Sequence, residues 1–488
     1  MSTPISETIA AIATAPGTAG VGIIRISGPE AWAIASRCVR LNRPLQPWRV
    51  QLGWARSAPD DNHQAANTAP EDLDQALVLA FRAPKSFTGE DVVELHLHGG
   101  PFVLQAALRV LLDAGAVLAG PGAFTQRAFL NGKLDLTQAE AIADVLAAQG
   151  QRALVAATHT LKTQALAQWV DAWRQQIIAI QAPIVAATDF PDEVDEPERA
   201  PLIAALQAQA SALADAVAQA KTMRRLQQGR TVVLLGQPNA GKSTLFNTLV
   251  CHERAIVTPI AGTTRDTLQE TLMLEGVPVT LTDTAGLREQ TPDAVEQLGI
   301  SRSWAACHSA DAVLFLVDST TLTGQDVTGA AAFPPADREA LQALHVQCPQ
   351  TPVAIVLTKT DQRKVTVQAG ASSSLGLPLL PVVAVQGAVG IQPVMTWLQA
   401  TLIAQGESAS PAATQQALVA LNERQVSCLT AVQSCLDLAA TTLANPHCPL
   451  DMTTVPLSEA LYHIDVLTGR VTTEEVLDAV FSQFCVGK

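Results

Sequence analysis

The sequence predicts a multidomain protein that combines α/β and all-α parts: an α+β N-terminal head, a helical domain, and an α/β domain inserted into the helical one. The 488 residues suffice for about three domains. Strand and helix patterns alternate over residues 1–121 and 226–403, whereas residues 122–225 and 404–488 keep apolar residues at helical spacing. We infer the insertion because helical patterns lie on both sides of residues 226–403. Four domains in a row are the alternative.

Composition limits the class of protein. Apolar residues make up 48% of the chain, yet no run of about 18 apolar residues predicts a membrane span. The start, "MSTPISETIA", lacks the basic and apolar segments of a secretory signal. The eight cysteines include no CxxC pair, which argues against a zinc knuckle, and scattered thiols fit a reducing cytoplasm. The net charge of −14 argues against a surface covered in phosphate contacts, but it permits a local basic patch.

Local patterns place several elements of the head and the helical domain. "VGIIRISG" (21–28) and "DVVELHLHGG" (91–100) have the residue types of strands that end in glycine turns. We expect His96 and His98, which alternate on the second strand, to pack or hydrogen-bond rather than bind a metal. The polar stretch 56–72 is typical of a surface loop. The acidic "DFPDEVDEP" (189–197) favours a solvated turn over a cation site.

The strongest motif is "GQPNAGKS" at 236–243, which fits the phosphate-loop pattern GxxxxGK[ST]. The apolar strand "RTVVLLG" overlaps its start and the helical "TLFNTLV" follows it, which is the context that a phosphate loop requires. Backbone N–H groups at the helix N-terminus can then face the phosphates of a nucleotide. We expect Lys242 to reach the β- and γ-phosphates and the Ser243 hydroxyl to bind Mg²⁺.

More segments follow in the order found in Ras-like GTPases. "GTTRD" places Thr264 to bind Mg²⁺, and "DTAG" places Asp283 to hold a water of the Mg²⁺ shell and a glycine N–H to meet the γ-phosphate. "TKTD" ends a further strand with Asp361. Its carboxylate can accept hydrogen bonds from both N1–H and the amino group of guanine, a pair that adenine does not offer. The sequence therefore predicts a Ras-like G domain that prefers guanine.

This G domain departs from the usual pattern in three places. Thr358 stands where Asn is commoner, so we expect the loss of one amide contact to the base or the loop. Ala384-Val385-Gln386 replaces a "SAK"-like segment, although a backbone N–H there can still meet guanine O6. Leu287 follows "DTAG", where Ras-like enzymes have a glutamine that positions water. An apolar side chain cannot orient the attacking water, so another group must.

Over essentially its whole length, the chain resembles the MnmE (TrmE) family of tRNA modification GTPases. A phosphate loop alone would not be specific to this family, whereas the matching stretches together are. They are "TAGVGIIRISG", "SFTGEDVVELHLHGG", "PGAFTQRAFLNGKLDLTQAEA", "GQPNAGKS", "IVTPIAGTTRD", "DTAGLREQTPDAVEQLGISRS" and the terminal "FCVGK".

The resemblance implies a GTP hydrolase that acts in tRNA modification. It implies a folate-binding head that dimerises, a helical domain, and a G domain inserted into the latter. The family acts with the flavoprotein MnmG to install an aminomethyl or carboxymethylaminomethyl group on carbon five of the wobble uridine of certain tRNAs. A methylene- or 5-formyl-tetrahydrofolate is the implied folate, with the one-carbon unit coming from the methylene form and the nitrogen from ammonium or glycine.

In this family, potassium takes the place of an arginine finger. A cation at that position neutralises the charge that develops on the phosphoryl group. The residues that match its ligands, some through backbone oxygens, are Asn239, Thr258, Ile260 and Thr263. From the residues alone, a capping side chain is the alternative for Asn239.

The resemblance also implies where the other nucleotide contacts and the water-positioning group lie. The implied GTP-binding set is Asn239, Ala240, Gly241, Lys242, Ser243, Thr244, Thr258, Pro259, Ile260, Ala261, Gly262, Thr263, Thr264, Asp283, Thr284, Ala285, Gly286, Thr358, Lys359, Asp361, Ala384, Val385 and Gln386. Glu296 matches a catalytic glutamate of the second switch, which orients water through a bridge and would supply what Leu287 cannot. A solvated helix position is the alternative for Glu296.

The family's folate site joins the head to the C-terminus. The positions that match folate contacts are Arg25, Glu94, Lys133 and Lys488. A carboxylate there can accept from the pterin edge, and the cations can meet the glutamate tail or carbonyl groups. The alternatives are a surface ion pair for Arg25, a strand charge for Glu94 and a helix-start cation for Lys133. Gly487 permits a close turn, and Cys485 then lies beside the one-carbon unit, where we predict a catalytic role against the alternative of a buried apolar thiol.

The alternative function is that of an RNA or ribosome assembly GTPase of the Era or Der kind, which works as a switch. Such a switch needs neither the head stretch "SFTGED" nor the terminal "CVGK", so both stretches favour the modification enzyme. We expect a cytoplasmic homodimer with tRNA and MnmG as its partners.

Overall fold

The computed structural model describes residues 7–57, 71–227, 229–253, 268–283, 306–323, 328–329, 332–363, 371–373, 376–403 and 421–488. The chain forms two compact units. One comprises Met1–Leu146, Thr158–Leu213 and Ser427–Lys488, and the other comprises Ala147–Ala157 and Ala214–Val426. The domain boundaries given above stay predictions.

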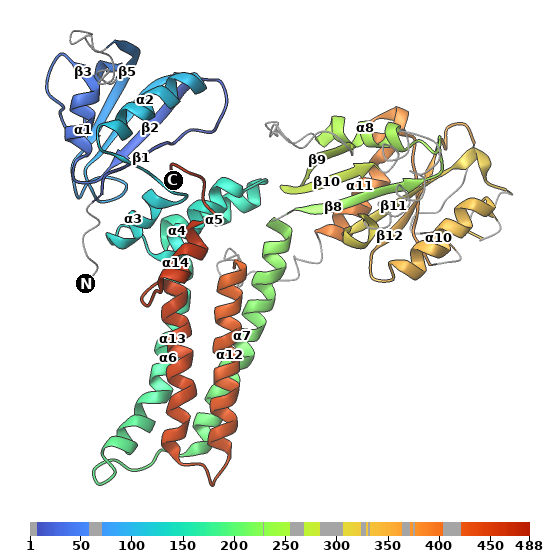
Figure 1. Cartoon of the computed structure of the whole chain (residues 1–488). Helices are drawn as coiled ribbons and strands as arrows, with labels where there is room; N and C mark the ends of the chain where they lie inside the picture. The colour runs from blue at the N-terminus through green and yellow to red at the C-terminus, as the bar shows by residue number, and fades with distance from the viewer. Residues whose placement is uncertain are drawn as a thin grey trace, which may run out of the picture. The chain divides into compact units, whose positions relative to one another are not determined.

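The head is built on a seven-stranded sheet with the order β3-β4-β5-β6-β2-β1-β7 (Figure 1). All neighbouring strands are antiparallel except β1 and β7. The strands are β1 (Ile9–Ile12), β2 (Ala19–Ser27), β3 (Val39–Leu41), β4 (Val50–Arg56), β5 (Asp72–Phe81), β6 (Val92–Gly99) and β7 (Val117–Leu118). The helices are α1 (Ala31–Cys38) and α2 (Pro101–Asp113).

Strands β2 and β6 confirm the two strands predicted from the glycine-bounded stretches. The chain turns after β2 at Gly28, whose φ of +137° is a conformation that favours glycine. The two strands pair antiparallel and place Arg25 opposite Glu94. This register brings two predicted site residues together on one face of the sheet, because side chains of directly opposed residues point the same way.

One face of the head sheet packs against α1 and α2 in a hydrophobic core that includes Ile26, Ile34, Leu104 and Leu111. Alternate residues of β4 and β5 point away from that core. Leu52 and Leu77 are paired across these strands, and their side chains stay 55% and 46% exposed. The head thus presents an apolar patch on the sheet face opposite the helices.

The helical region confirms the predicted change of pattern near Gly122. Its elements are α3 (Ala123–Leu130), α4 (Leu136–Ala147), α5 (Gln151–Thr163), α6 (Ala165–Asp189), α7 (Arg199–Gln227), α12 (Glu423–Ala444), the short η7 (Leu450–Thr453), α13 (Thr454–Thr468) and α14 (Glu474–Phe481). The continuous helical spacing predicted for the first part is broken at Gly150 and at Gln164, whose φ is +53°. The acidic stretch after α6 is an exposed turn, as predicted.

The two halves of the helical sequence pack side by side (Figure 1). The Arg174 guanidinium on α6 donates to Asp465 on α13 at 2.9 Å. Two turns further along α6, the Gln181 amide donates to the Ser458 hydroxyl at 2.8 Å. At the other end, Arg199 of α7 donates to carbonyl groups after α12, with the Asn445 carbonyl oxygen 2.9 Å away. Segments separated by the whole G-domain sequence therefore form one bundle.

Two helices, Arg199–Arg224 within α7 and the whole of α12, are long and apolar enough to cross a membrane by length and composition alone. Helices buried in the core of a soluble protein pass the same test. Both helices bury residues at helical spacing, for example Leu206, Ala210 and Leu213 on α7, and Val432 and Leu436 on α12. That pattern is typical of packing within a helical bundle, and it gives the membrane interpretation little support.

The predicted α/β region forms a six-stranded sheet with the order β13-β12-β11-β8-β10-β9, in which only β9 is antiparallel (Figure 1). The strands are β8 (Arg230–Gly236), β9 (Leu268–Leu274), β10 (Val277–Asp283), β11 (Ala312–Asp318), β12 (Val353–Thr358) and β13 (Leu379–Pro381). Its helical elements among the described residues are α8 (Lys242–Glu253), η2 (Ser319–Thr321), α10 (Pro335–Gln347), η4 (Ala384–Gln386) and α11 (Ala388–Leu402).

This parallel sheet is buried on both faces. One core cluster includes Leu245 and Leu398 from α8 and α11, and a separate cluster includes Leu341 from α10. The near-continuous apolar sequences of β11 and β12 follow from this double burial. Loops at the carboxyl ends of such strands are where ligands bind in open α/β sheets, so the phosphate-loop sequence after β8 stands at the expected edge.

The eight cysteines are free thiols. Burial raises the pKa of Cys38 to about 11, and burial with the neighbouring Cys348 raises the pKa of Cys307 to about 12. These two thiols are therefore protonated packing groups near neutral pH.

Candidate functional site

The phosphate loop joins β8 to α8 and bends at three residues with positive φ. These are Gly236 at +148°, Asn239 at +63° and Gly241 at +89°. At Gly236, a Cβ atom would lie 2.4 Å from the Leu316 carbonyl oxygen of the neighbouring strand, so only glycine fits there. The Lys242 ammonium, which is 7% exposed, donates to the carbonyl oxygens of Gly236 and Gln237 at 2.9 and 2.8 Å.

These contacts wrap the loop around the Lys242 side chain at the start of α8. Ser243 and Thr244, the next two predicted contact residues, are exposed at the helix N-terminus. Backbone N–H groups in this first turn have no partner within the helix, and the helix dipole favours an anion there. The loop can therefore receive phosphate groups, and the role of the exposed Ser243 as a ligand for Mg²⁺ stays a prediction.

Thr358 ends β12 and contacts the phosphate loop directly. Its hydroxyl lies 2.8 Å from the Ala240 carbonyl oxygen and 3.2 Å from that of Val317, and the side chain is buried. The threonine hydroxyl therefore keeps a contact with the loop at this position, and the expected loss of an amide contact to the base stays a prediction.

Lys359 follows in a left-handed conformation with φ of +55°, and its ammonium pairs with Asp318 at 2.6 Å. Burial alone would raise the pKa of Asp318, but hydrogen bonds from Lys359 and Thr320 outweigh it and hold this pKa below its usual value. The pair ties the end of β12 to the end of β11 and leaves Asp361, two residues on, exposed.

The two segments predicted to recognise guanine lie next to each other. The Thr360 hydroxyl donates to the Val382 carbonyl at 3.1 Å, just before the 3-10 turn that holds Ala384, Val385 and Gln386. The Thr248 hydroxyl of α8 donates to the Ala384 carbonyl at 3.3 Å. These bonds assemble the "TKTD" segment, the η4 turn and the helix after the phosphate loop into one corner of the sheet edge.

Asp283 ends β10, where its backbone is in register with Leu234 of β8, so its strand runs beside the one that leads into the phosphate loop. The Asp283 side chain and the other predicted switch residues lie outside the described residues. Those others are Thr258, Pro259, Ile260, Ala261, Gly262, Thr263, Thr264, Thr284, Ala285, Gly286, Leu287 and Glu296. Their roles stay predictions.

A second group of predicted site residues gathers on the head sheet. Arg25 and Glu94 pair at 2.9 Å, with each side chain only 17% exposed. The second Glu94 oxygen lies 3.2 Å from Nε2 of His96. The Arg25 guanidinium lies over the rings of Phe87 and Phe124, at 5.3 and 5.6 Å from their centres. The site therefore combines a cation, an anion and two aromatic faces.

The C-terminal tail packs against this group. The Phe124 N–H donates to the Lys488 carbonyl at 3.1 Å, and Val486 forms an antiparallel bridge with Pro121. Gly487 has φ of +94°, and a Cβ atom there would lie 2.4 Å from the Ile12 carbonyl oxygen at the end of β1. The predicted return of the tail to the head is thus confirmed, and Phe124 joins the tail to Arg25.

Upstream of this tail, Phe484 is buried with Leu136 and Phe481 in a small core, which explains why the end of the chain is held in place. Cys485 is exposed, so the alternative that it is a buried apolar thiol is wrong. Its backbone carbonyl accepts from Gly122 at 3.4 Å. The structure gives it a fixed position at the head, while its catalytic role stays a prediction.

Lys133 contacts the loop that carries Phe87. Its ammonium donates to the Pro84 carbonyl at 3.1 Å, and the neighbouring Asn131 amide donates to the Thr88 carbonyl at 2.7 Å. Both bonds hold the 84–88 loop that carries Phe87 beside Arg25. Arg25 and Glu94 thus pair directly, Lys488 is joined to Phe124 through a backbone hydrogen bond, and Lys133 contacts the loop that carries Phe87.

Sequence reasoning missed three residues that build this site. Phe87 and Phe124 flank Arg25, and the buried Arg127 donates to Glu90 at 2.9 Å and to the Ser27 carbonyl at 3.2 Å. The signal was present, because Phe87 and Glu90 lie in "SFTGED" and the other two in "PGAFTQR". His96 and His98 hydrogen-bond to Glu94 and Asp74, as predicted.

A phosphate loop after the central parallel strand, an aspartate at the end of the adjacent strand, and a "TKTD" turn beside it define a P-loop GTPase. Family models agree with a more specific class. A model described as the GTP-binding protein TrmE N-terminus matches residues 8–133, and one described as the MnmE helical domain matches residues 136–485. The chain belongs to the MnmE family of tRNA modification GTPases.

Individual relatives extend over the whole chain. The tRNA modification GTPase MnmE of Chloroflexus aurantiacus is 41% identical over 487 residues, which cover 99% of this chain and 100% of the relative. The protein of the same name from Thermotoga maritima is 34% identical over 484 residues, which again cover 99% and 100%. A third, from Synechococcus sp. (strain WH7803), is 38% identical and covers 99% and 98%.

Proposed function

We propose that this chain is a potassium-dependent GTP hydrolase that acts with the flavoprotein MnmG to modify tRNA. The pair installs an aminomethyl or carboxymethylaminomethyl group on carbon five of the wobble uridine, with a tetrahydrofolate as one-carbon donor. The observation that carries the proposal is the hydrogen bond from the Phe124 N–H to the Lys488 carbonyl. It joins the C-terminal tail to the group around Arg25 and Glu94, and we call these residues the head-and-tail site. The chain thus has a second candidate site besides the phosphate loop.

The residues of the head-and-tail site suit a folate. Glu94 has two oxygens with about four lone-pair positions, and the contacts to Arg25 and His96 use two of them, so a pterin amino group can still bind there. The rings of Phe87 and Phe124 offer apolar faces for a planar heterocycle. Lys133 and the Lys488 side chain are cations for the carboxylates of the glutamate tail.

The nucleotide site supports hydrolysis that is separate from the bond-forming chemistry. Lys242 would contact the β- and γ-phosphates, Ser243 and Thr264 would hold Mg²⁺, and Asn239, Thr258, Ile260 and Thr263 would hold K⁺. The cations would supply positive charge against the phosphoryl group, and Glu296 would orient the attacking water. The exposed position of Asn239 in the described part of the loop is compatible with such a ligand.

The proposal includes a homodimer that assembles through the head. The exposed, paired Leu52 and Leu77 supply an apolar patch of the kind that marks protein–protein interfaces. It also includes the insertion of residues 226–403 into the helical domain and a cytoplasmic location. The packing of α6 on α13 and the helical-domain match over 136–485 support the insertion.

Calorimetric titration of the full-length chain with 5-formyl-tetrahydrofolate tests the folate site. We expect Glu94→Gln to weaken binding at least about tenfold, which is about 1.4 kcal/mol. Asp74→Asn is the matched control, because Asp74 also pairs with a histidine on β6 but outside the site. Equal binding by Glu94→Gln and wild type would refute the folate assignment.

GTP hydrolysis tests the other site independently. We expect hydrolysis to fall when Na⁺ replaces K⁺, to exceed ATP hydrolysis clearly, and to be lost in Lys242→Ala without a change in folate binding. Equal rates of GTP hydrolysis in K⁺ and in Na⁺ would contradict the potassium site. Equal rates of GTP and ATP hydrolysis would contradict the guanine preference. Nucleoside analysis of tRNA from a strain that lacks this chain tests the whole function. We expect its wobble uridine to lack the modification, and we expect that a variant of either single site does not restore the modification.

A further inference from the structure

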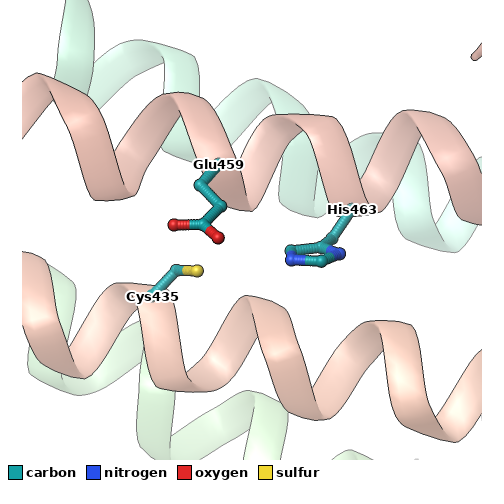
Figure 2. Close-up of side chains that lie close together, drawn as sticks. All are labelled: Cys435, Glu459 and His463. Atoms are coloured by element: carbon teal, nitrogen blue, oxygen red, sulfur yellow. The ribbon is translucent and has the colours of Figure 1, made fainter.

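A cluster of three metal-ligating side chains lies between α12 and α13, and it shares no residue with either site described above. It consists of Cys435 on α12 and of Glu459 and His463 on α13. Their ligand atoms all lie within 4.8 Å of one another, and this is the only such group of three in the ranges that the structure describes. Figure 2 shows the three side chains pointing toward one another across the space between the two helices.

The helix geometry explains the juxtaposition. Glu459 and His463 are four residues apart on α13, so they lie on the same face one turn apart. Cys435 faces them from the neighbouring helix, with its side chain buried. Glu459 is exposed and His463 is half-buried, so the cluster is closed on the thiol side and open to solvent on the carboxylate side.

The three side chains have no other evident task. In the described part of the chain, no side-chain hydrogen bond or ion pair joins Cys435, Glu459 or His463 to another residue, and the imidazole has a ring contact with Tyr462. The imidazole, the carboxylate and the thiol therefore face one another, and their ligand atoms are available to a bound ion.

We propose that Cys435, Glu459 and His463 bind one Zn²⁺ ion that ties α12 to α13. A sulfur, nitrogen and oxygen donor set suits this borderline-soft cation, and three protein ligands with water in the fourth position is a recurrent zinc arrangement. Metal–ligand bonds of about 2.0–2.3 Å place the ligand atoms of a tetrahedral site roughly 3.3–3.7 Å apart. Binding therefore requires the ligand atoms, which now lie within 4.8 Å of one another, to move closer together through rotation of the side chains.

Binding involves no redox step. The thiol proton of Cys435 passes to solvent when the sulfur bonds to Zn²⁺, and the histidine binds in its neutral form. The open edge at Glu459 gives the ion a path from solvent and gives the bound water its place. The inference is independent of the folate and GTP assignments, because it uses neither site.

The test is metal binding by the full-length chain, freed of metal with a chelator and carrying no histidine tag. Zn²⁺ affinity is measured by calorimetry, and Co²⁺ serves as a spectroscopic probe because only a thiolate ligand gives a charge-transfer band in the near ultraviolet. We expect one equivalent of Zn²⁺ to bind and the Co²⁺ band to form. Cys435→Ser should abolish that band, and both Cys435→Ser and His463→Gln should weaken Zn²⁺ binding at least about 100-fold, since even neighbours of metal ligands contribute about 10–100-fold.

Cys428→Ser is the matched control, because it removes another thiol of the same helix, two turns away, and should leave the band and affinity unchanged. Should Cys435→Ser fail to fold, His463→Gln and Glu459→Gln carry the test, since they change more exposed positions. Wild-type protein without the band would overturn the proposal. So would folded His463→Gln and Cys435→Ser variants that bind Zn²⁺ within about threefold of wild type.

Discussion

The hydroxyl of Thr358 lies 2.8 Å from the carbonyl oxygen of Ala240 and so joins the end of β12 to the phosphate loop. Both groups are buried, so the carbonyl depends on this donor. We expect Thr358→Val, which keeps the shape but removes the hydroxyl, to destabilise the G domain by about 1–3 kcal/mol and to weaken GDP binding. Urea unfolding and GDP titration measure the two effects. Thr358→Ser is the control and should stay close to wild type, and a Val variant as stable as wild type would contradict this role.

The close approach of Gly487 to Ile12 gives a second prediction. Alanine there meets both an unfavourable φ of +94° and a carbonyl oxygen 2.4 Å from its Cβ, so the tail must move away from β1. We expect Gly487→Ala to lower 5-formyl-tetrahydrofolate affinity at least about tenfold while GTP hydrolysis stays unchanged. Gly120→Ala, where nothing lies within 4 Å of the added Cβ, should bind folate normally. Normal folate binding by both variants would show that the tail does not contribute to the folate site.

The Asp318–Lys359 pair predicts a pH-dependent contribution to stability. Because the folded pKa of Asp318 lies below its usual value, the pair stabilises the fold above the unfolded pKa of about 3.9, and this contribution is lost as pH falls through the folded pKa. The Lys359 side chain is 34% exposed, so solvent screening limits the effect to about 1 kcal/mol. We expect Asp318→Asn to be less stable than wild type at about pH 7, with the difference shrinking toward acid. Unfolding midpoints across this pH range measure the stability difference, and Glu339→Gln, at an exposed position, is the control. A stability difference that grows toward acid pH would contradict the lowered pKa of Asp318.

The apolar patch at Leu52 and Leu77 predicts the oligomeric state. A lysine in place of either leucine puts a charge into the centre of the proposed interface, where desolvation disfavours it. We expect the full-length chain to be a dimer in light-scattering measurements and Leu52→Lys and Leu77→Lys to be monomers. Val346→Lys, at an even more exposed apolar position on α10, should leave the dimer intact. A dimer that survives both leucine substitutions must use another surface.

The elements whose residues are local in sequence could be predicted from the sequence. The glycines and Lys242 of the phosphate loop, the strand before it and the helix after it follow from spacing alone, because each contact spans only a few residues. The glycine-bounded strands β2 and β6 were found for the same reason. The match of "SFTGED" and the terminal "CVGK" to one family also pointed to a site at the two ends of the chain.

Which distant side chains meet depends on how the whole chain folds. Periodicity shows which face of a helix or strand is apolar, but it does not show what packs against that face, since the packing depends on how the whole chain folds. The hydroxyl of the threonine in "TKTD" can donate to the phosphate loop because folding places the end of β12 beside Ala240. The rings on either side of Arg25, and Cys435 opposite His463, come from segments far apart in the sequence, and folding alone brings them within reach of one another.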